Sequence, residues 1–164
     1  MVRVRIAFLA DHPELKPILA QWFYDEWVST EGIPLDTLQN QLDENMNADR
    51  IPVTWVALHG NTPIGSVSID LDDLPGSGYP GPWLASFYII PSQRGQGVGR
   101  ALLTHALRFA RDCGLDDLYL WTKQPSELYR SLGWKTLAPG YVGTTAVTVM
   151  YWNAALADLN TEVS

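Results

Sequence analysis

The sequence predicts a mixed α/β fold, and three features carry this prediction. Segments that alternate apolar and polar residues, as strands do, are interspersed with segments of helical period. A turn at residues 59–62 separates two β-rich runs and indicates a hairpin. A strand at 83–90, a glycine-rich loop, a helix and a strand at 118–122 follow one another, which indicates one parallel crossover. The element order is roughly β-αα-ββ-β-α-β-α-ββ.

The N-terminal part of the chain predicts one strand and two helices. Residues 2–8 alternate as a strand should. Residues 11–29 carry apolar side chains near helical spacing, despite Pro17 early in the pattern. Residues 34–46 form a shorter amphipathic pattern, and Pro34 suits the first turn of its helix.

The middle of the chain predicts a hairpin, a loop and a buried strand. Residues 53–71 hold the two strands of the hairpin. Residues 72–82 are crowded with glycine and proline, which is typical of a loop. Residues 83–90 are almost continuously apolar, which predicts that this strand is buried on both faces.

The C-terminal part predicts two helices and three strands. The helix that follows the glycines is expected to end at Gly114. One side of it is apolar and carries Val98, Leu102, Ala106, Phe109 and Cys113. The remaining elements are a strand at 115–122, a short helix at 125–133 and strands at 134–138 and 144–152. We expect the closing strand, 144–152, to be able to pair with its copy in a homodimer.

Composition and charge narrow the function classes. A length of 164 residues with 46% hydrophobic residues fits one domain with a sizeable core. The net charge of −7 argues against nucleic-acid binding and fits either cationic partners or simple solubility. A single cysteine excludes an internal disulfide, and no apolar run approaches the roughly 18 residues of a membrane span. We therefore expect a cytoplasmic protein with no membrane or nucleic-acid partner.

Three glycines, Gly95, Gly97 and Gly99, lie between the strand that ends before Pro91 and the next helix. The start of a helix offers main-chain N–H groups and a partial positive charge, and glycines let the backbone approach an anion. The dinucleotide fingerprint G-x-G-x-x-G does not fit, because no glycine occupies its final position. The P-loop does not fit, because the chain has no Gly-Lys pair.

The motif R/Q-x-x-G-x-G/A does fit, from Arg94 to Gly99, after a strand and a proline and before a long helix. Here the sequence resembles the GCN5-related N-acetyltransferases (GNAT), whose pyrophosphate loop for acetyl-CoA has this form. The resemblance continues through Y-x-x-x-G-[FW], read as Tyr129 to Trp134. It covers residues 51–137 well, whereas residues 1–50 match only in helical outline.

The resemblance implies a GNAT fold: a mixed, mostly antiparallel sheet with a central splayed pair of parallel strands, flanked by about four helices. It also implies one acetyltransferase domain over residues 1–164. Residues 1–50 would form acceptor-side helices, 51–137 the acetyl-CoA-binding core, and 138–164 the closing strand and tail.

The resemblance further implies how acetyl-CoA is held. The pantetheine arm would pair with the strand at Phe87, Tyr88 and Ile89 as a further strand does. Arg94 and Arg100 either add charge at the loop or are merely a solvated helix start. The pyrophosphate would lie on the amides of the loop, whose residues are Arg94, Gly95, Gln96, Gly97, Val98, Gly99 and Arg100.

By the same resemblance, an amine attacks the thioester directly, and Tyr129 is the candidate general acid that protonates the departing thiolate. Cys113 lies at the predicted C-terminal end of its helix, where the helix dipole opposes a thiolate, so we expect it to be part of the core. Many relatives have a glutamate on the strand before the loop, but here only Ser86 is available.

Asp70 is our substitute for the missing base, and Asp72, Asp73, Asp25 and Glu26 are alternatives. The aromatic residues of "WFYDEW" and Trp83 either form a wall for a cationic acceptor or pack in the core. The three histidines lack ligand-like spacing, so we expect no metal, and His105 is assigned to the outer side of its helix.

The sequence thus predicts an acetyl-CoA-dependent N-acetyltransferase that acts on a primary amine of a small molecule or peptide. Two alternatives stay open. The chain could be a catalytically silent acyl-CoA-binding sensor or scaffold, which the missing glutamate suggests. It could instead be a nucleotide-binding protein that uses the glycine turn for ATP or NAD.

Overall fold

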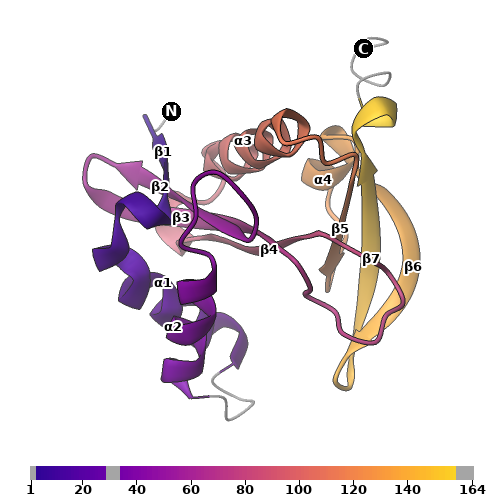
Figure 1. Cartoon of the computed structure of the whole chain (residues 1–164), viewed down its shortest axis with the longest axis horizontal. Coiled ribbons are helices and arrows are strands. Elements are labelled where there is room, and N and C mark those ends of the chain that lie inside the picture. The colour runs from indigo at the N-terminus through magenta and orange to yellow at the C-terminus, as the bar shows by residue number, and fades with distance from the viewer. Residues whose placement is uncertain (1–2, 29–33, 158–164) are drawn as a thin grey trace. The chain divides into compact units, whose positions relative to one another are not determined.

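The computed structural model describes residues 3–28 and 34–157. Seven strands form one mixed sheet in the order β1-β2-β3-β4-β5-β7-β6 (Figure 1). The chain divides into two compact units, one of residues 1–69 with 86–106 and one of 70–85 with 107–164. The strands are β1 Arg5–Phe8, β2 Val53–His59, β3 Thr62–Asp70, β4 Trp83–Ile89, β5 Asp117–Thr122, β6 Lys135–Val142 and β7 Thr145–Asn153.

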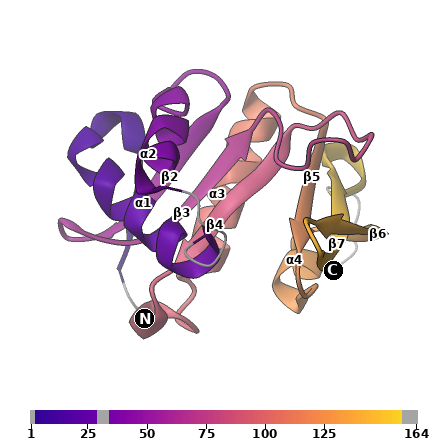
Figure 2. The same ribbon diagram turned by 90° about the horizontal axis from the view of Figure 1, so that it is seen from below.

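In the first unit, β1, β2 and β3 are antiparallel neighbours, and the predicted hairpin is confirmed. Its turn is Gly60-Asn61, where Gly60 has a φ of +63°, a conformation that favours glycine. The helices α1 (Lys16–Phe23) and α2 (Leu35–Glu44) lie on one face of these strands. The first half of α3 (Val98–Asp112) lies on the opposite face (Figure 1, Figure 2).

The two faces of β2 bury different side chains, as strand alternation requires. Val56 and Leu58 pack with residues of α1 and α2. Trp55 points to the other face, where its ring meets that of His105 on α3 edge-on at 5.7 Å. The expectation that His105 lies on the outer side of its helix is therefore wrong, because this half-buried ring fills space against Trp55.

The predicted helix over residues 11–29 is shorter than expected. Two short 3₁₀ turns, Leu9–Asp11 and Pro13–Leu15, precede α1, and a π-helical turn, Tyr24–Val28, follows it. Proline lacks the N–H that an interior α-helical position needs, which accounts for the late start of the regular helix. Residue 29 and the start of the predicted strand 2–8 fall outside the described residues.

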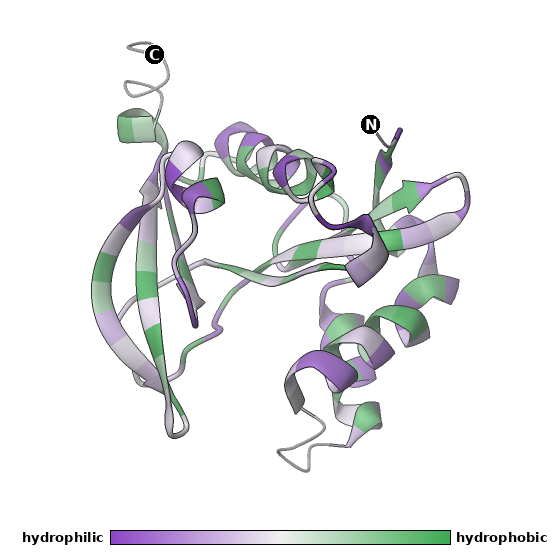
Figure 3. Cartoon of the chain, turned by 180° about the vertical axis from the view of Figure 1, so that it is seen from behind, coloured by the Kyte–Doolittle hydropathy of each residue, from purple (hydrophilic) through white to green (hydrophobic). Residues whose placement is uncertain are grey.

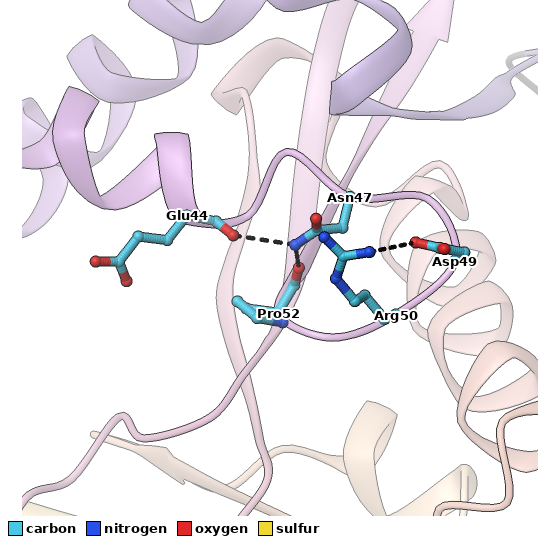
Figure 4. Close-up of polar contacts among 5 residues, drawn as sticks. All are labelled: Glu44, Asn47, Asp49, Arg50 and Pro52. Carbon is cyan, nitrogen blue, oxygen red and sulfur yellow. Dashed lines mark hydrogen bonds and ion pairs between the residues drawn. The ribbon is translucent and has the colours of Figure 1, made fainter.

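The side chain of Asn47 bridges the loop from α2 to β2. Its Nδ2 donates hydrogen bonds to the carbonyl oxygens of Glu44 at 3.1 Å and Pro52 at 2.7 Å (Figure 4). The neighbouring Arg50 and Asp49 form only an exposed ion pair at 3.4 Å. Because Asn47 joins the end of α2 to the start of β2, it sets the path by which the chain enters the sheet.

In the second unit, β7 lies between β5 and β6 and is antiparallel to both. Figure 3 shows hydrophobic and polar residues alternating along β6 and β7. The expectation that the closing strand pairs across a homodimer is wrong, because both of its edges are already occupied within the chain. The edge strand on this side of the sheet is β6 instead.

The parallel crossover is confirmed, since β4 and β5 are parallel neighbours with Trp83 opposite Tyr119. β4 departs from its prediction in one respect: Trp83, Leu84 and Ala85 are buried, but residues 86–89 are only half-buried. Within the part of the chain that the structure describes, no helix has the length and apolar character needed to cross a membrane.

Candidate functional site

The glycine turn connects β4 to α3 through a 3₁₀ turn, Pro91–Gln93. Gly95 and Gly97 have φ values of +75° and +87°, which other residues adopt only with strain. A Cβ added to either glycine would have no heavy atom within 4 Å, and both residues are exposed. The turn therefore leaves open space beside its backbone.

The first turn of α3 follows directly after this space. The N–H of Ala101 donates to the carbonyl of Gly97 at 3.1 Å, which is the first bond of the helical ladder. The amides of Val98 and Gly99 precede that bond, in the first helical turn, where the partial positive charge of the helix lies. Val98 as a whole residue is only 2% exposed, whereas the neighbouring Gly97 and Arg100 are exposed.

Arg94 folds back onto β4. Its Nε donates to the carbonyl of Ile89 at 2.9 Å, and its guanidinium lies 5.6 Å from the centroid of the Tyr88 ring. Both contacts tie the beginning of the turn to the end of the strand. Gln96 adds a longer contact, from its Nε2 to the carbonyl of Ser92 at 3.4 Å.

The main-chain groups of β4 alternate between its two edges. The N–H of Ile90 donates to the carbonyl of Ile64 on β3 at 3.0 Å, and the carbonyl of Tyr88 also lies on the β3 side, beside Gly65. By alternation, the main-chain groups of Phe87 and Ile89 are directed to the opposite edge. The Arg94 bond to the Ile89 carbonyl agrees with this assignment.

Ser86 interrupts β4 at the position where the sequence lacks the glutamate of many relatives. Its φ of +51° is an unusual value for a residue other than glycine. Its carbonyl accepts a hydrogen bond from Ser66 Oγ of β3 at 2.9 Å. Burial along the strand also changes here, from complete before Ser86 to partial after it.

Aromatic rings gather around Tyr88. The Trp22 ring lies 5.5 Å from it in a tilted arrangement, and the Trp27 ring meets it edge-on at 6.0 Å. All three are half-buried, and the acidic Asp25 and Glu26 between the tryptophans are exposed. These rings pack against one another and are still partly exposed. The arrangement therefore agrees with both expected roles, core packing and a wall for a cationic acceptor.

Tyr129 lies in the short helix α4 (Glu127–Ser131) and is half-buried. Burial raises the pKa of its phenol from 10.0 to about 12. Its ring meets that of Trp134 edge-on at 6.5 Å, and its carbonyl accepts the Trp134 N–H at 3.1 Å. The phenol therefore stays protonated throughout the neutral range.

Asp73, in the loop between β3 and β4, has the most unusual carboxyl group of the described residues. Burial, followed by repulsion from Asp70 and Asp72, raises its pKa from 3.8 to about 7, against the opposing effect of the Trp121 indole. Trp121 Nε1 donates to the main-chain carbonyl of Asp73 at 3.0 Å, which fixes the loop against β5. The sequence shows three acidic residues within four positions, Asp70, Asp72 and Asp73, but it does not show the burial of Asp73.

Cys113 is exposed, so the expectation that it belongs to the core is wrong. The helix α3 ends at Asp112, so Cys113 is the first residue after the helix. Partial desolvation and the Asp112 carboxylate raise the pKa of the thiol, which disfavours a thiolate nucleophile. Among the described residues, no group of three or more His, Cys, Asp and Glu is arranged to hold a metal ion.

Comparison with known proteins shows which family this chain resembles. Residues 16–134 match the Acetyltransferase (GNAT) family. N-acetyltransferase 8 of Rattus norvegicus is 29% identical over 128 residues, which are 74% of this chain and 57% of that protein. N-acetyltransferase 8B of the same organism is 31% identical over 103 residues, or 62% and 46% of the two chains. The chain thus spans about half the length of the curated relatives it matches.

Solved structures share the fold at low sequence identity. Aminoglycoside 6'-acetyltransferase type Ii superposes with a TM-score of 0.70 at 20% identity, over 91% of this chain and 96% of that one. An aminoglycoside 6'-N-acetyltransferase complexed with coenzyme A gives a TM-score of 0.70 at 17% identity over the same shares. These likenesses confirm the predicted fold class. Because the family match runs from α1 through the glycine turn to Trp134, the chain belongs to the GNAT family of acetyltransferases.

Proposed function

We propose that this protein transfers an acetyl group from acetyl-CoA directly to a primary amine of a small molecule or peptide. The observation that carries the proposal is the exposed glycine turn at the start of α3, with open space at Gly95 and Gly97. A helix start with accessible amides suits an anionic diphosphate without any basic side chain. The chain's membership of the GNAT family supports this use of the turn.

The turn and β4 would share the binding of the co-substrate. The amides from Gly95 to Arg100 would hold the diphosphate, and the outward main-chain groups of Phe87 and Ile89 would pair with the pantetheine arm. Tyr88 would contribute its ring rather than its main chain, since its carbonyl lies on the β3 side. Acetyl-CoA supplies the activated acyl group, and the chain orients it.

In the transfer, the amine nitrogen bonds to the thioester carbon and the carbon–sulfur bond breaks. Tyr129 would donate a hydrogen bond or its proton to the departing sulfur, because its phenol stays protonated at neutral pH. The proton of the attacking ammonium needs an acceptor, since an alkyl amine of pKa about 10.4 is almost fully protonated at pH 7.

Asp73 is the proposed acceptor of that proton, either directly or through water. A base works best when its pKa lies near the working pH, and its raised value of about 7 satisfies this condition. Asp70, the base that the sequence predicts, then has a supporting role, because its charge helps to raise the pKa of Asp73. Asp72, Asp25 and Glu26 are exposed.

The acceptor is proposed to be cationic. The net charge of −7 attracts amines, and exposed acids flank the aromatic group of Trp22, Trp27 and Tyr88. The likeness to aminoglycoside acetyltransferases makes amino sugars one reasonable class to test, beside polyamines and peptide N-termini. A single domain and a cytoplasmic location remain part of this proposal.

The direct test measures release of coenzyme A by the purified protein with a panel of amino sugars, polyamines, amino acids and peptides. Acceptor-dependent release is expected for at least one class. The sensor alternative is favoured by Ser86 in place of a glutamate. Tight binding of acetyl-CoA without acceptor-dependent release across the panel would support it and contradict the transferase.

Gly97→Ala is expected to weaken acetyl-CoA binding by about tenfold or more, because the new Cβ enters the open space assigned to the diphosphate. Calorimetric titration measures the change. Gly114→Ala is the matched control, since Gly114 also has positive φ and open space but lies at the other end of α3. Equal affinities for the two folded variants would contradict the assignment.

Tyr129→Phe is expected to lower kcat by roughly 10²-fold, the usual contribution of an acid catalyst, with acetyl-CoA affinity within about twofold. Since the phenol has a pKa of about 12, wild-type kcat should show no loss assignable to Tyr129 below about pH 11. Tyr141→Phe, at an exposed position on β6, is the control. A turnover number unchanged by Tyr129→Phe would remove the acid role.

Asp73→Asn is expected to lower kcat/KM most strongly above pH 7, where the wild-type carboxylate is ionised. Its folded pKa is raised, so wild-type stability should fall as pH increases from about 4 to 7. The variant should lack this loss and be more stable at pH 8 by on the order of 2–4 kcal/mol.

Urea unfolding between pH 4 and 8 measures the stability difference for Asp73→Asn. Asp49→Asn, at a position exposed on the loop before β2, serves as control and should follow the wild type. If stability changes as expected but kcat/KM keeps its pH profile, Asp73 is buried without being the base.

A further inference from the structure

Three consecutive residues of β3 hold the second half of β4. Ile64 accepts the N–H of Ile90 through its carbonyl at 3.0 Å. Ser66 donates its hydroxyl to the carbonyl of Ser86 at 2.9 Å. Gly65, between them, lets β4 come close to β3.

The close approach at Gly65 is tight. A Cβ at this position would lie 2.8 Å from Ile89 Cδ1 and 3.0 Å from the carbonyl oxygen of Tyr88. The Ile89 methyl group can move aside, but the Tyr88 carbonyl is part of the backbone, so a side chain at position 65 would crowd β4 at this point. The path of β4 after Ser86 is therefore set by its contact with β3.

Ser66 supplies a hydrogen-bond donor at the backbone irregularity of Ser86, which we call the kink. The positive φ of Ser86 turns its peptide out of regular strand geometry, so the carbonyl needs a donor other than a ladder N–H. The Ser66 side chain is fully buried, and its hydroxyl supplies that donor. Without it, the left-handed conformation at Ser86 loses the contact that offsets its strain.

We propose that Ser66 is a positioning residue for the acetyl transfer. Its hydroxyl fixes the kink at Ser86, and the kink sets the direction of the outward main-chain groups of Phe87 and Ile89. Ser66 acts through Ser86 and does not touch the substrate. The inference rests on the proposed function, because it assigns those outward groups to the pantetheine and thioester.

Ser68 provides a matched control on the same strand. It is also fully buried, and it lies two residues further on the same face. Its Oγ shares a hydrogen bond of 2.7 Å with Thr54 Oγ1 of β2, so it stabilises the sheet on the side away from β4. Ser68→Ala should therefore cost stability without altering the kink.

Hydrogen exchange followed by mass spectrometry tests the positioning role without relying on activity. In the wild type, acetyl-CoA is expected to slow exchange of segment 86–90 and of segment 95–100. Ser66→Ala should reduce the slowing at 86–90 about fivefold or more while keeping that at 95–100 within about twofold. Ser68→Ala should keep both.

Kinetics supply the second readout. Ser66→Ala is expected to lower kcat about tenfold or more with the KM for acetyl-CoA within about threefold, since misalignment at the reacting end acts on kcat. Ser86→Gly added to Ser66→Ala should restore part of kcat, because glycine adopts positive φ without strain. A purely structural role would predict no such rescue.

The outcomes separate this inference from the proposed function. If the wild type shows protection at both segments and turnover, but Ser66→Ala matches Ser68→Ala in exchange and kcat, the inference is overturned and the transferase stands. If the wild type acetylates no amine, the proposed transfer fails, and the protection of 86–90 still decides the role of Ser66. Absence of wild-type protection at both segments would overturn both.

Discussion

The proposed site depends on hydrogen bonds from the main-chain N–H groups at the start of α3 to an anionic diphosphate. Directly before these N–H groups, Gly95 and Gly97 adopt positive φ and leave open space beside the backbone. A side chain at either position would fill that space and strain the turn. Arg94 joins this turn to β4 through the Ile89 carbonyl, so the turn and the strand are fixed to each other by the chain itself.

The second half of β4 must then present its main chain in a defined direction, and β3 imposes that direction. Gly65 permits the close approach, and Ser66 holds the carbonyl of the kinked Ser86. Trp83, Leu84 and Ala85, before the kink, are buried. The change to half-buried residues after Ser86 is what gives this segment of β4 an accessible surface.

The sequence predicts much of the fold, because periodicity and turn residues are local signals. The hairpin at Gly60, the glycine turn and the parallel crossover follow from spacing alone and agree with the structure. The misassigned residues depend on tertiary contacts. His105 faces the sheet because its ring packs against that of Trp55. The interior position of β7 follows from the strand order, which no local sequence pattern encodes. The Ser66–Ser86 bond joins residues 20 positions apart and has no sequence signature.

Charge explains why the site would use main-chain groups for the anion. In a chain of net charge −7, an anionic diphosphate meets an unfavourable general field, whereas a cationic amine meets a favourable one. Dipoles at a helix start act within the first turn, so they bind the diphosphate locally without neutralising the acidic surface. Arg94, at the same turn, has its guanidinium group occupied by the Ile89 carbonyl and the Tyr88 ring. Holding the anion with neutral amides therefore lets one acidic protein accept two substrates of opposite charge.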